Sequence, residues 1–115
     1  EDPLPIARMP VPGEWDFRAS RRLPNGGLNH AFTGWSGRAS IHWPHRALSL
    51  HVEAEADVYV LYVPAGEDFF CFEPVDHPIN AVHLPGGAVV NGMTALAPGQ
   101  QLERRFRFRV EAGAA

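Results

Sequence analysis

The sequence has 115 residues, of which 45% are hydrophobic, and its formal charge is −3 at neutral pH. This length suits one domain or a piece of one. The small net charge and the lack of basic runs argue against a nucleic-acid partner, and no apolar run reaches the roughly 18 residues of a membrane span. The single cysteine, Cys71, excludes an internal disulfide and is typical of a cytoplasmic protein.

Glycine and proline occur 11 times each and divide the chain into short segments, which is typical of an all-β protein. Residues 1–13 are rich in proline, so we expect an irregular arm or a connection there. Residues 14–111 are expected to form the folded part, and residues 112–115 a short tail. The chain begins without methionine or a signal sequence, which indicates a fragment.

The first strong turn signal is Asn25-Gly26-Gly27, because Asn-Gly adopts positive φ angles at little cost. After it, alternating or continuous apolar residues predict strands at 39–43, 46–53, 58–63, 69–73, 88–96 and 102–110. The segment 58–63 is apolar on both faces and should lie at the centre of a sheet. No segment has a sustained helical period, so we expect an antiparallel β-sandwich or part of one.

The segment from Phe69 to His77 carries a carboxylate at the end of an aromatic strand. In a strand, Cys71 and Glu73 share one face and Phe72 lies on the other, while Pro74 is expected to end the ladder. Burial of an unpaired carboxylate is costly, so a half-desolvated Glu73 is expected to serve as a general base near neutral pH. The alternative is a structural Glu73 that pairs with an arginine at the strand end.

An ordered series of short motifs resembles the C-terminal part of the aldose 1-epimerases, the galactose mutarotase family. Asp16-Phe17-Arg18 precedes the series and also looks like the family. The motifs are Leu28-Asn29-His30-Ala31-Phe32-Thr33-Gly34-Trp35-Ser36-Gly37, Tyr62-Val63-Pro64, Phe70-Cys71-Phe72-Glu73-Pro74, Asn80-Ala81, Gly92-Met93 and Leu96-Ala97-Pro98-Gly99. The resemblance covers nearly the whole chain but only the last part of the family's larger antiparallel sandwich.

The resemblance implies an isomerase that interconverts the α and β anomers of a free aldohexose without a cofactor. It implies that Glu73 is the general base and that Asn29 contacts sugar hydroxyls. Many members have an aspartate at the position of Asn29, and an amide can still donate and accept hydrogen bonds there. The family's acid histidine and a second sugar-binding histidine lie upstream of this region. A complete parent protein is therefore expected to be the enzyme, and this chain alone to be inactive.

Five further groups carry weaker signals. Trp35 could stack on a sugar or pack in the core. His77 could touch sugar, orient Glu73 or simply lie in an exposed loop. The histidines near His42-Trp43-Pro44-His45 match no common zinc pattern, so no metal site is predicted. Arg105, Arg107 and Arg109 are expected to form a solvated outer face, and Cys71 is expected to be a small buried residue.

Two alternatives to catalysis by this chain stay open. The chain could be a carbohydrate-binding or structural β-sandwich module without turnover. It could also pair with another chain through open sheet edges, because unpaired strands seek partners.

Overall fold

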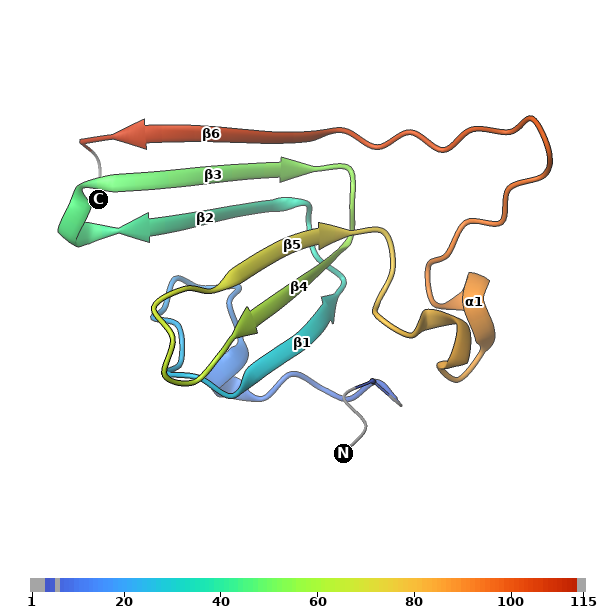
Figure 1. Ribbon diagram of the computed structural model, residues 1–115, viewed down its shortest axis with the longest axis horizontal. Coiled ribbons are helices and arrows are strands. Elements are labelled where there is room, and N and C mark those ends of the chain that lie inside the picture. The colour runs from blue at the N-terminus through green and yellow to red at the C-terminus, as the bar shows by residue number, and fades with distance from the viewer. Residues whose placement is uncertain (1–3, 6, 114–115) are drawn as a thin grey trace.

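The computed structural model describes residues 4–5 and 7–113, so the expectations for residues 1–3, 6 and 114–115 of the arm and tail lie outside the described residues. The strands form two three-stranded antiparallel sheets, in the orders β1-β4-β5 and β2-β3-β6 (Figure 1). They are β1 (Leu28–Thr33), β2 (Arg38–Trp43), β3 (Leu48–Ala54), β4 (Val58–Val63), β5 (Cys71–Val75) and β6 (Phe106–Ala112). The predicted all-β, antiparallel fold class is confirmed.

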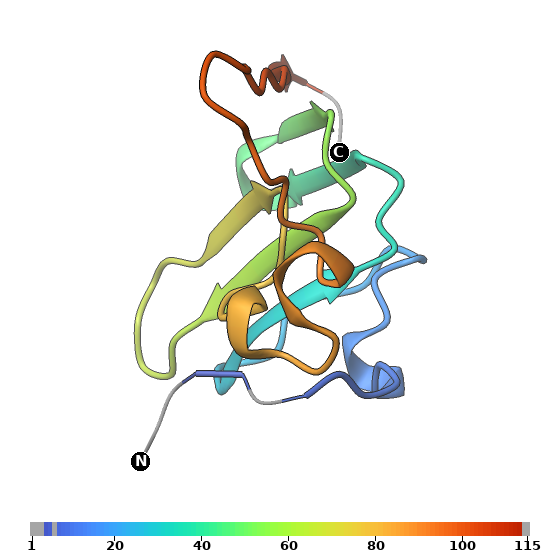
Figure 2. The same cartoon turned by 90° about the vertical axis from the view of Figure 1, so that its right-hand side faces the viewer.

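Helical structure is short in the described part of the chain. It comprises the 3-10 turns η1 (Gly13–Trp15), η2 (Pro44–Arg46) and η3 (Ala81–His83) and the helix α1 (Gly87–Val90). Among residues 4–5 and 7–113, no helix is long and apolar enough to cross a lipid bilayer. Figure 2 shows η3 and α1 on one side of the β1-β4-β5 sheet, with the β2-β3-β6 sheet above it.

Strand β4 is buried on both faces of the β1-β4-β5 sheet, since Val58 and Val60 on one face are 4% and 3% exposed. The main core cluster lies on the other face and consists of Leu28, Phe32, Leu61 and Val63. The turn η1 and the chain that leads from it to β1 cover this face, and the partly buried side chains packed there are Trp15, Phe17, Leu23, Tyr59, Phe70 and Phe72. Burial of each large apolar side chain contributes about 1.5–3 kcal/mol. β4 lies between β1 and β5, as its apolar pattern predicts.

In the β2-β3-β6 sheet, strand β6 shows the predicted alternation, but its apolar face is exposed. Arg107 and Arg109 share one face of β6, and Phe106, Phe108 and Val110 share the other. The three apolar side chains of β6 remain 44%, 57% and 67% exposed, respectively. The strand pattern of β6 is therefore confirmed, whereas its apolar face lacks the cover that the core sheet has.

The predicted turn before β1 makes a close approach to the β4–β5 connection. Gly26 has φ of +149°, and a Cβ atom there would lie 2.5 Å from the Cα atom of Ala65. Only glycine fits this contact without a backbone shift. The turn thus joins the start of β1 to the loop between β4 and β5.

Two expectations about strands were wrong. The sequence did not predict β1 as a strand. Its larger side chains, Leu28, His30 and Phe32, nevertheless alternate with the smaller Asn29, Ala31 and Thr33. Pro74 does not end the ladder, because β5 continues to Val75 and Pro74 pairs opposite Tyr59. β5 is an edge strand, where proline can leave its missing N–H on the open side.

The strand expected at 88–96 is also wrong. Residues 87–90 form α1, and the buried Asn91 side chain donates hydrogen bonds to the carbonyl oxygens of Pro85 and Gly87 at 3.0 and 2.7 Å. These bonds close a compact loop that an extended strand would open.

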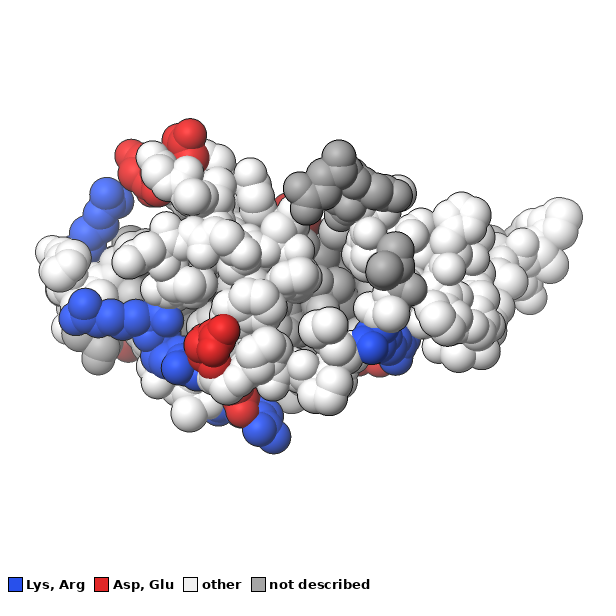
Figure 3. Space-filling model, turned by 90° about the horizontal axis from the view of Figure 1, so that it is seen from below, with Lys and Arg blue, Asp and Glu red and all other residues white. Residues whose placement is uncertain are grey.

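Between Asp76 and Glu103 the sequence contains no Asp, Glu, Lys or Arg, and Figure 3 shows the corresponding end of the molecule free of charged side chains on the face seen from below.

Candidate functional site

The face of the β1-β4-β5 sheet opposite the core carries the two predicted sugar-facing residues Asn29 and Glu73. The register places Asn29, Tyr62 and Cys71 in one row across the three strands. The next row along the sheet contains Ala31, Val60 and Glu73. Strand spacing and rise put the Cα atoms of Asn29 and Glu73 about 12 Å apart on the same face. Their side chains therefore flank one patch of the sheet surface.

Glu73 is exposed, so the expectation of a buried carboxylate was wrong. β5 is the edge strand of its sheet, and the neighbouring aromatic rings of Phe70 and Phe72 lie on the opposite face. Cys71 shares the face of Glu73, as predicted, and is partly buried. No ion pair joins Glu73 to another described residue, so the arginine-paired alternative finds no partner there.

A shallow depression lies beside Asn29 at the end of β4. The side chains of Asn29, Tyr62, Glu67 and Phe69 line it, together with Gly27, Leu28, Val63, Pro64 and Ala65. The Tyr62 side chain is 37% exposed, and its ring meets that of Phe69 edge to face with centroids 6.5 Å apart. Exposed aromatic rings beside an amide offer a flat apolar surface with nearby hydrogen-bonding groups.

Tyr62, Phe69 and Glu67 were not among the predicted site residues. A signal for Tyr62 was available, because alternation along 58–63 places its side chain opposite that of Leu61 and therefore away from the core. Phe69 and Glu67 lie in the β4–β5 connection, and only the turn geometry brings them to this depression. Local pattern carries no comparable signal for loop residues.

His77 lies in the loop that follows β5, beyond the end of the strand that carries Glu73. It is partly buried, and a Cβ atom at Gly92 would lie 3.5 Å from the Cβ atom of His77. The neighbouring Asp76 accepts a 3.0 Å hydrogen bond from the Nε atom of Arg104. No hydrogen bond joins His77 to Glu73 among the described residues, so its role as an orienting group stays a prediction.

Trp35 lies on the other side of the sheet. Its Nε1 atom donates a 2.8 Å hydrogen bond to the carbonyl oxygen of Arg38. Its ring packs edge to face against Tyr59 and Phe72, with centroid distances of 5.6 and 5.7 Å. Both neighbours belong to the core face, which Glu73 does not share. The structure therefore favours the core-packing interpretation of Trp35 and does not bring it to Asn29 and Glu73.

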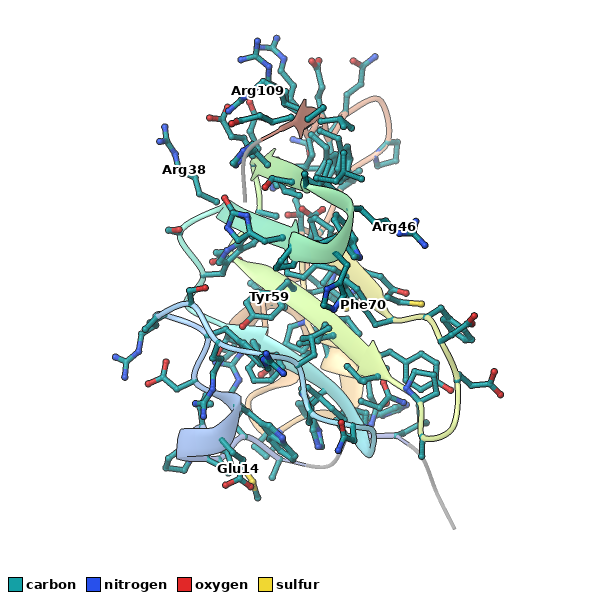
Figure 4. The ribbon with its side chains drawn as sticks, turned by 90° about the vertical axis from the view of Figure 1, so that its left-hand side faces the viewer. Glu14, Arg38, Arg46, Tyr59, Phe70 and Arg109 are labelled. Carbon is teal, nitrogen blue, oxygen red and sulfur yellow. The ribbon has the colours of Figure 1, made fainter. Side chains whose placement is uncertain are left out.

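The described residues whose pKa values are shifted also lie on the core side of the β1-β4-β5 sheet. Burial, with a smaller contribution from Asp16, raises the pKa of the Tyr59 hydroxyl. Hydrogen bonds from Arg18 hold the pKa of the Asp16 carboxyl at about 2. Figure 4 labels Tyr59 and Phe70 on this side of the sheet. In the described ranges, no group of three or more His, Cys, Asp or Glu side chains could hold a metal ion.

The fold and this surface define an all-β protein with an exposed amide and an exposed carboxylate on one face of a sheet. No protein-family profile matches the chain. The uncharacterized protein YphB of Escherichia coli K12 is 34% identical over 110 residues, covering 88% of this chain and 37% of YphB.

The structural comparison gives the more specific resemblance. A crystal structure of an Escherichia coli K12 protein provisionally assigned as an aldose 1-epimerase matches with a TM-score of 0.78 and 31% identity. The match covers 90% of this chain and 38% of that protein. The resemblance to an aldose 1-epimerase that the sequence predicts is thus confirmed in fold. The chain spans less than two fifths of the length of each of these relatives.

Proposed function

We propose that this chain forms the base-bearing part of an aldose 1-epimerase site, which interconverts the α and β anomers of a free aldohexose. The observation that carries the proposal is the strand register, since it sets the exposed residues Asn29 and Glu73 on the same face of the sheet. The fold similarity to a provisionally assigned aldose 1-epimerase supports the reaction class. As part of the same proposal, the protein is cytoplasmic and residues 14–111 form its folded domain, as the sequence predicts.

In this proposal, the Glu73 carboxylate accepts the proton of the anomeric hydroxyl. The ring C–O bond breaks, an acid protonates the ring oxygen, the C1–C2 bond rotates, and the ring closes on its other face. The Asn29 amide donates and accepts hydrogen bonds with sugar hydroxyls, and it does so without a charge. General base catalysis of this kind is worth about 10²–10⁴-fold in rate. No cofactor takes part in these steps.

The remainder of the parent protein supplies the acid in this proposal. The family resemblance places the acid histidine upstream of this region, and the chain covers 38% of the matching structure. The outer strands β1, β5, β2 and β6 offer open edges to a further segment or chain. Native mass spectrometry would distinguish a monomer from a pair.

The test follows the optical rotation of freshly dissolved α-D-glucose and α-D-galactose with the complete parent protein and with its Glu73→Gln variant. Loss of about 10²-fold or more in rate on Glu73→Gln is the expected result. Glu53→Gln is the matched control, because Glu53 is exposed on the β2-β3-β6 sheet. Equal rates for the complete protein and its Glu73→Gln variant would contradict the base assignment.

A second candidate function is a carbohydrate-binding module without turnover. The observation that favours it is the open depression of Asn29, Tyr62 and Phe69, which faces solvent without an assigned acid. If the folded chain does not accelerate mutarotation, ligand-detected NMR with D-galactose should still report binding. Asn29→Ala and Tyr62→Ala should then weaken that binding, whereas Glu53→Gln should not.

A further inference from the structure

The polar face of the β2-β3-β6 sheet holds a chain of hydrogen bonds that links all three strands. The Ser40 Oγ atom on β2 lies 2.9 Å from the Nδ1 atom of His51 on β3. The His51 Nε2 atom lies 3.0 Å from the Oε2 atom of Glu111 on β6. Arg109 donates a 3.3 Å hydrogen bond to the same carboxylate oxygen. These groups lie on a different sheet from Glu73 and take no part in the proposed epimerase chemistry.

The partners fix the direction of each hydrogen bond. An ionised carboxylate can only accept, so the His51 Nε2 atom must carry the proton that it donates to Glu111. The Nδ1 atom of a neutral His51 then holds a lone pair, and the Ser40 hydroxyl must donate to it. This order of hydroxyl, imidazole and carboxylate is the arrangement of nucleophile, general base and orienting acid.

We propose that Ser40, His51 and Glu111 form a hydrolytic triad that cleaves short-chain carboxylic esters. This activity is independent of the epimerase site, because the two sets of residues share no member.

The backbone at Ser40 supplies a donor for the oxyanion. The Ala54 amide donates to the Gly37 carbonyl oxygen at 2.8 Å, so Gly37 and Ala54 form a hydrogen-bonded pair. Alternation along the antiparallel ladder makes Ser40 and His51 a non-hydrogen-bonded pair, whose side chains approach closely. The Ser40 N–H therefore points away from β3, toward the open edge of β2. An N–H on the nucleophile's own residue is a recurrent oxyanion donor.

The surroundings of His51 leave room for water. A cavity of about 40 Å³ lies beside it, lined by His51, Glu53, Arg107 and Arg109. That volume holds at least one water molecule, which is needed for deacylation. Figure 4 shows Arg38 and Arg109 extending from this sheet, where Arg38 lies 4.0 Å from the Glu53 carboxylate and Arg109 pairs with Glu111.

The reaction has two halves, acylation and deacylation of Ser40, and water is the only co-reactant that they need. Ser40 Oγ attacks the ester carbonyl carbon while its proton passes to His51 Nδ1, and the tetrahedral oxyanion forms. The intermediate collapses to acyl-Ser40, and the leaving alcohol takes the proton from His51. Water then attacks the acyl carbon with His51 as base, which releases the carboxylic acid and restores the Ser40 hydroxyl.

The test uses the full chain and p-nitrophenyl acetate. The sequence contains no lysine, so peptide mass spectrometry can assign an acetyl group without interference from lysine amines. We expect a burst of p-nitrophenol and acetylation of the peptide that contains Ser40. Ser40→Ala should abolish the adduct on this peptide and lower the rate about 10²-fold, and His51→Gln should lower the rate similarly.

The controls separate a triad from general surface reactivity. His42→Gln removes a second serine–histidine contact, in which the His42 Nδ1 atom lies 2.8 Å from the Ser49 Oγ atom, and should leave the rate unchanged. Cys71→Ala removes the thiol and should also leave it unchanged. Glu111→Gln keeps the shape of the side chain, so its expected loss in rate does not depend on unfolding, which circular dichroism checks. An unchanged rate in folded Ser40→Ala, or acetylation only at histidine or Cys71, would overturn the proposal.

Discussion

The β1-β4-β5 sheet and the edge strand β6 have similar alternation but very different degrees of burial. Leu28 in the β1-β4-β5 sheet is 1% exposed, as is Val52 in β3 at the centre of the other sheet, whereas Phe108 in β6 is 57% exposed. The difference lies in what covers each face: η1 and the chain after it pack on the first sheet, and the apolar face of β6 has no comparable cover among the described residues. Alternation therefore identifies a strand and its two faces, but burial depends on what packs against them.

The largest test of this comparison is a pair of truncations. Leu61→Ala removes a buried side chain from the core and should lower the free energy of unfolding by about 2–5 kcal/mol. Phe108→Ala removes a larger but exposed side chain and should cost about 0.5 kcal/mol or less. Urea unfolding followed by tryptophan fluorescence measures both. Equal losses would mean that the β6 face is covered in solution, by a second copy or another segment.

Gly26→Ala tests how firmly the cover is attached to the core sheet. The new Cβ atom would meet the Ala65 backbone at 2.5 Å, and φ of +149° strains any L side chain. We expect a loss of about 1–3 kcal/mol in unfolding free energy. Gly34→Ala is the matched control, since its φ is also positive but no atom lies within 4 Å of a Cβ atom there. A loss no larger than that of Gly34→Ala would contradict the role of the close contact.

The smallest expected effect is a pH dependence of the unfolding free energy, which only the β1-β4-β5 sheet should show. The pKa of Tyr59 is raised by burial above its ordinary value of 10.0, so the folded state holds this proton more tightly than the unfolded state. The stabilisation is complete below pH 10 and is lost as the pH rises through the pKa of the folded state. Unfolding free energies of the chain and of Tyr59→Phe, measured between pH 8 and about 11, should converge or cross as the pH rises.

Tyr62→Phe provides the control for this pH measurement. Tyr62 is on the exposed face and has no such burial. A slope that Tyr59→Phe does not alter would show that Tyr59 loses its proton equally easily in both states.

Sequence patterns revealed the central strand and the last strand because their alternation is local. The apolar run Val58–Val63 and the alternation at Phe106, Arg107 and Phe108 both match the structure. β1 was missed because Asn29, His30 and Thr33 dilute its apolar pattern. Propensity says little about a strand whose stability comes from its partners.

The candidate sites were less accessible from sequence for a different reason. Glu73 and Asn29 were identified by resemblance, yet the exposure of Glu73 follows from the edge position of β5, which depends on the order of strands. His51 and Glu111 are separated by 60 positions, and only the pairing of β3 with β6 brings them together. Such long-range juxtapositions leave no local signal.

The strict register of β3 with both of its neighbours makes this strand intolerant of a change in length. β3 pairs with β2 on one side and β6 on the other over most of its residues. Inserting or deleting a single codon within Leu48–Ala54 would invert the facing of every side chain beyond that point, turning Val52 to solvent and His51 toward the core. The irregular stretch between Gly92 and Glu103 has no such constraint. Length variation among natural variants of this protein should therefore accumulate in that stretch and avoid β3.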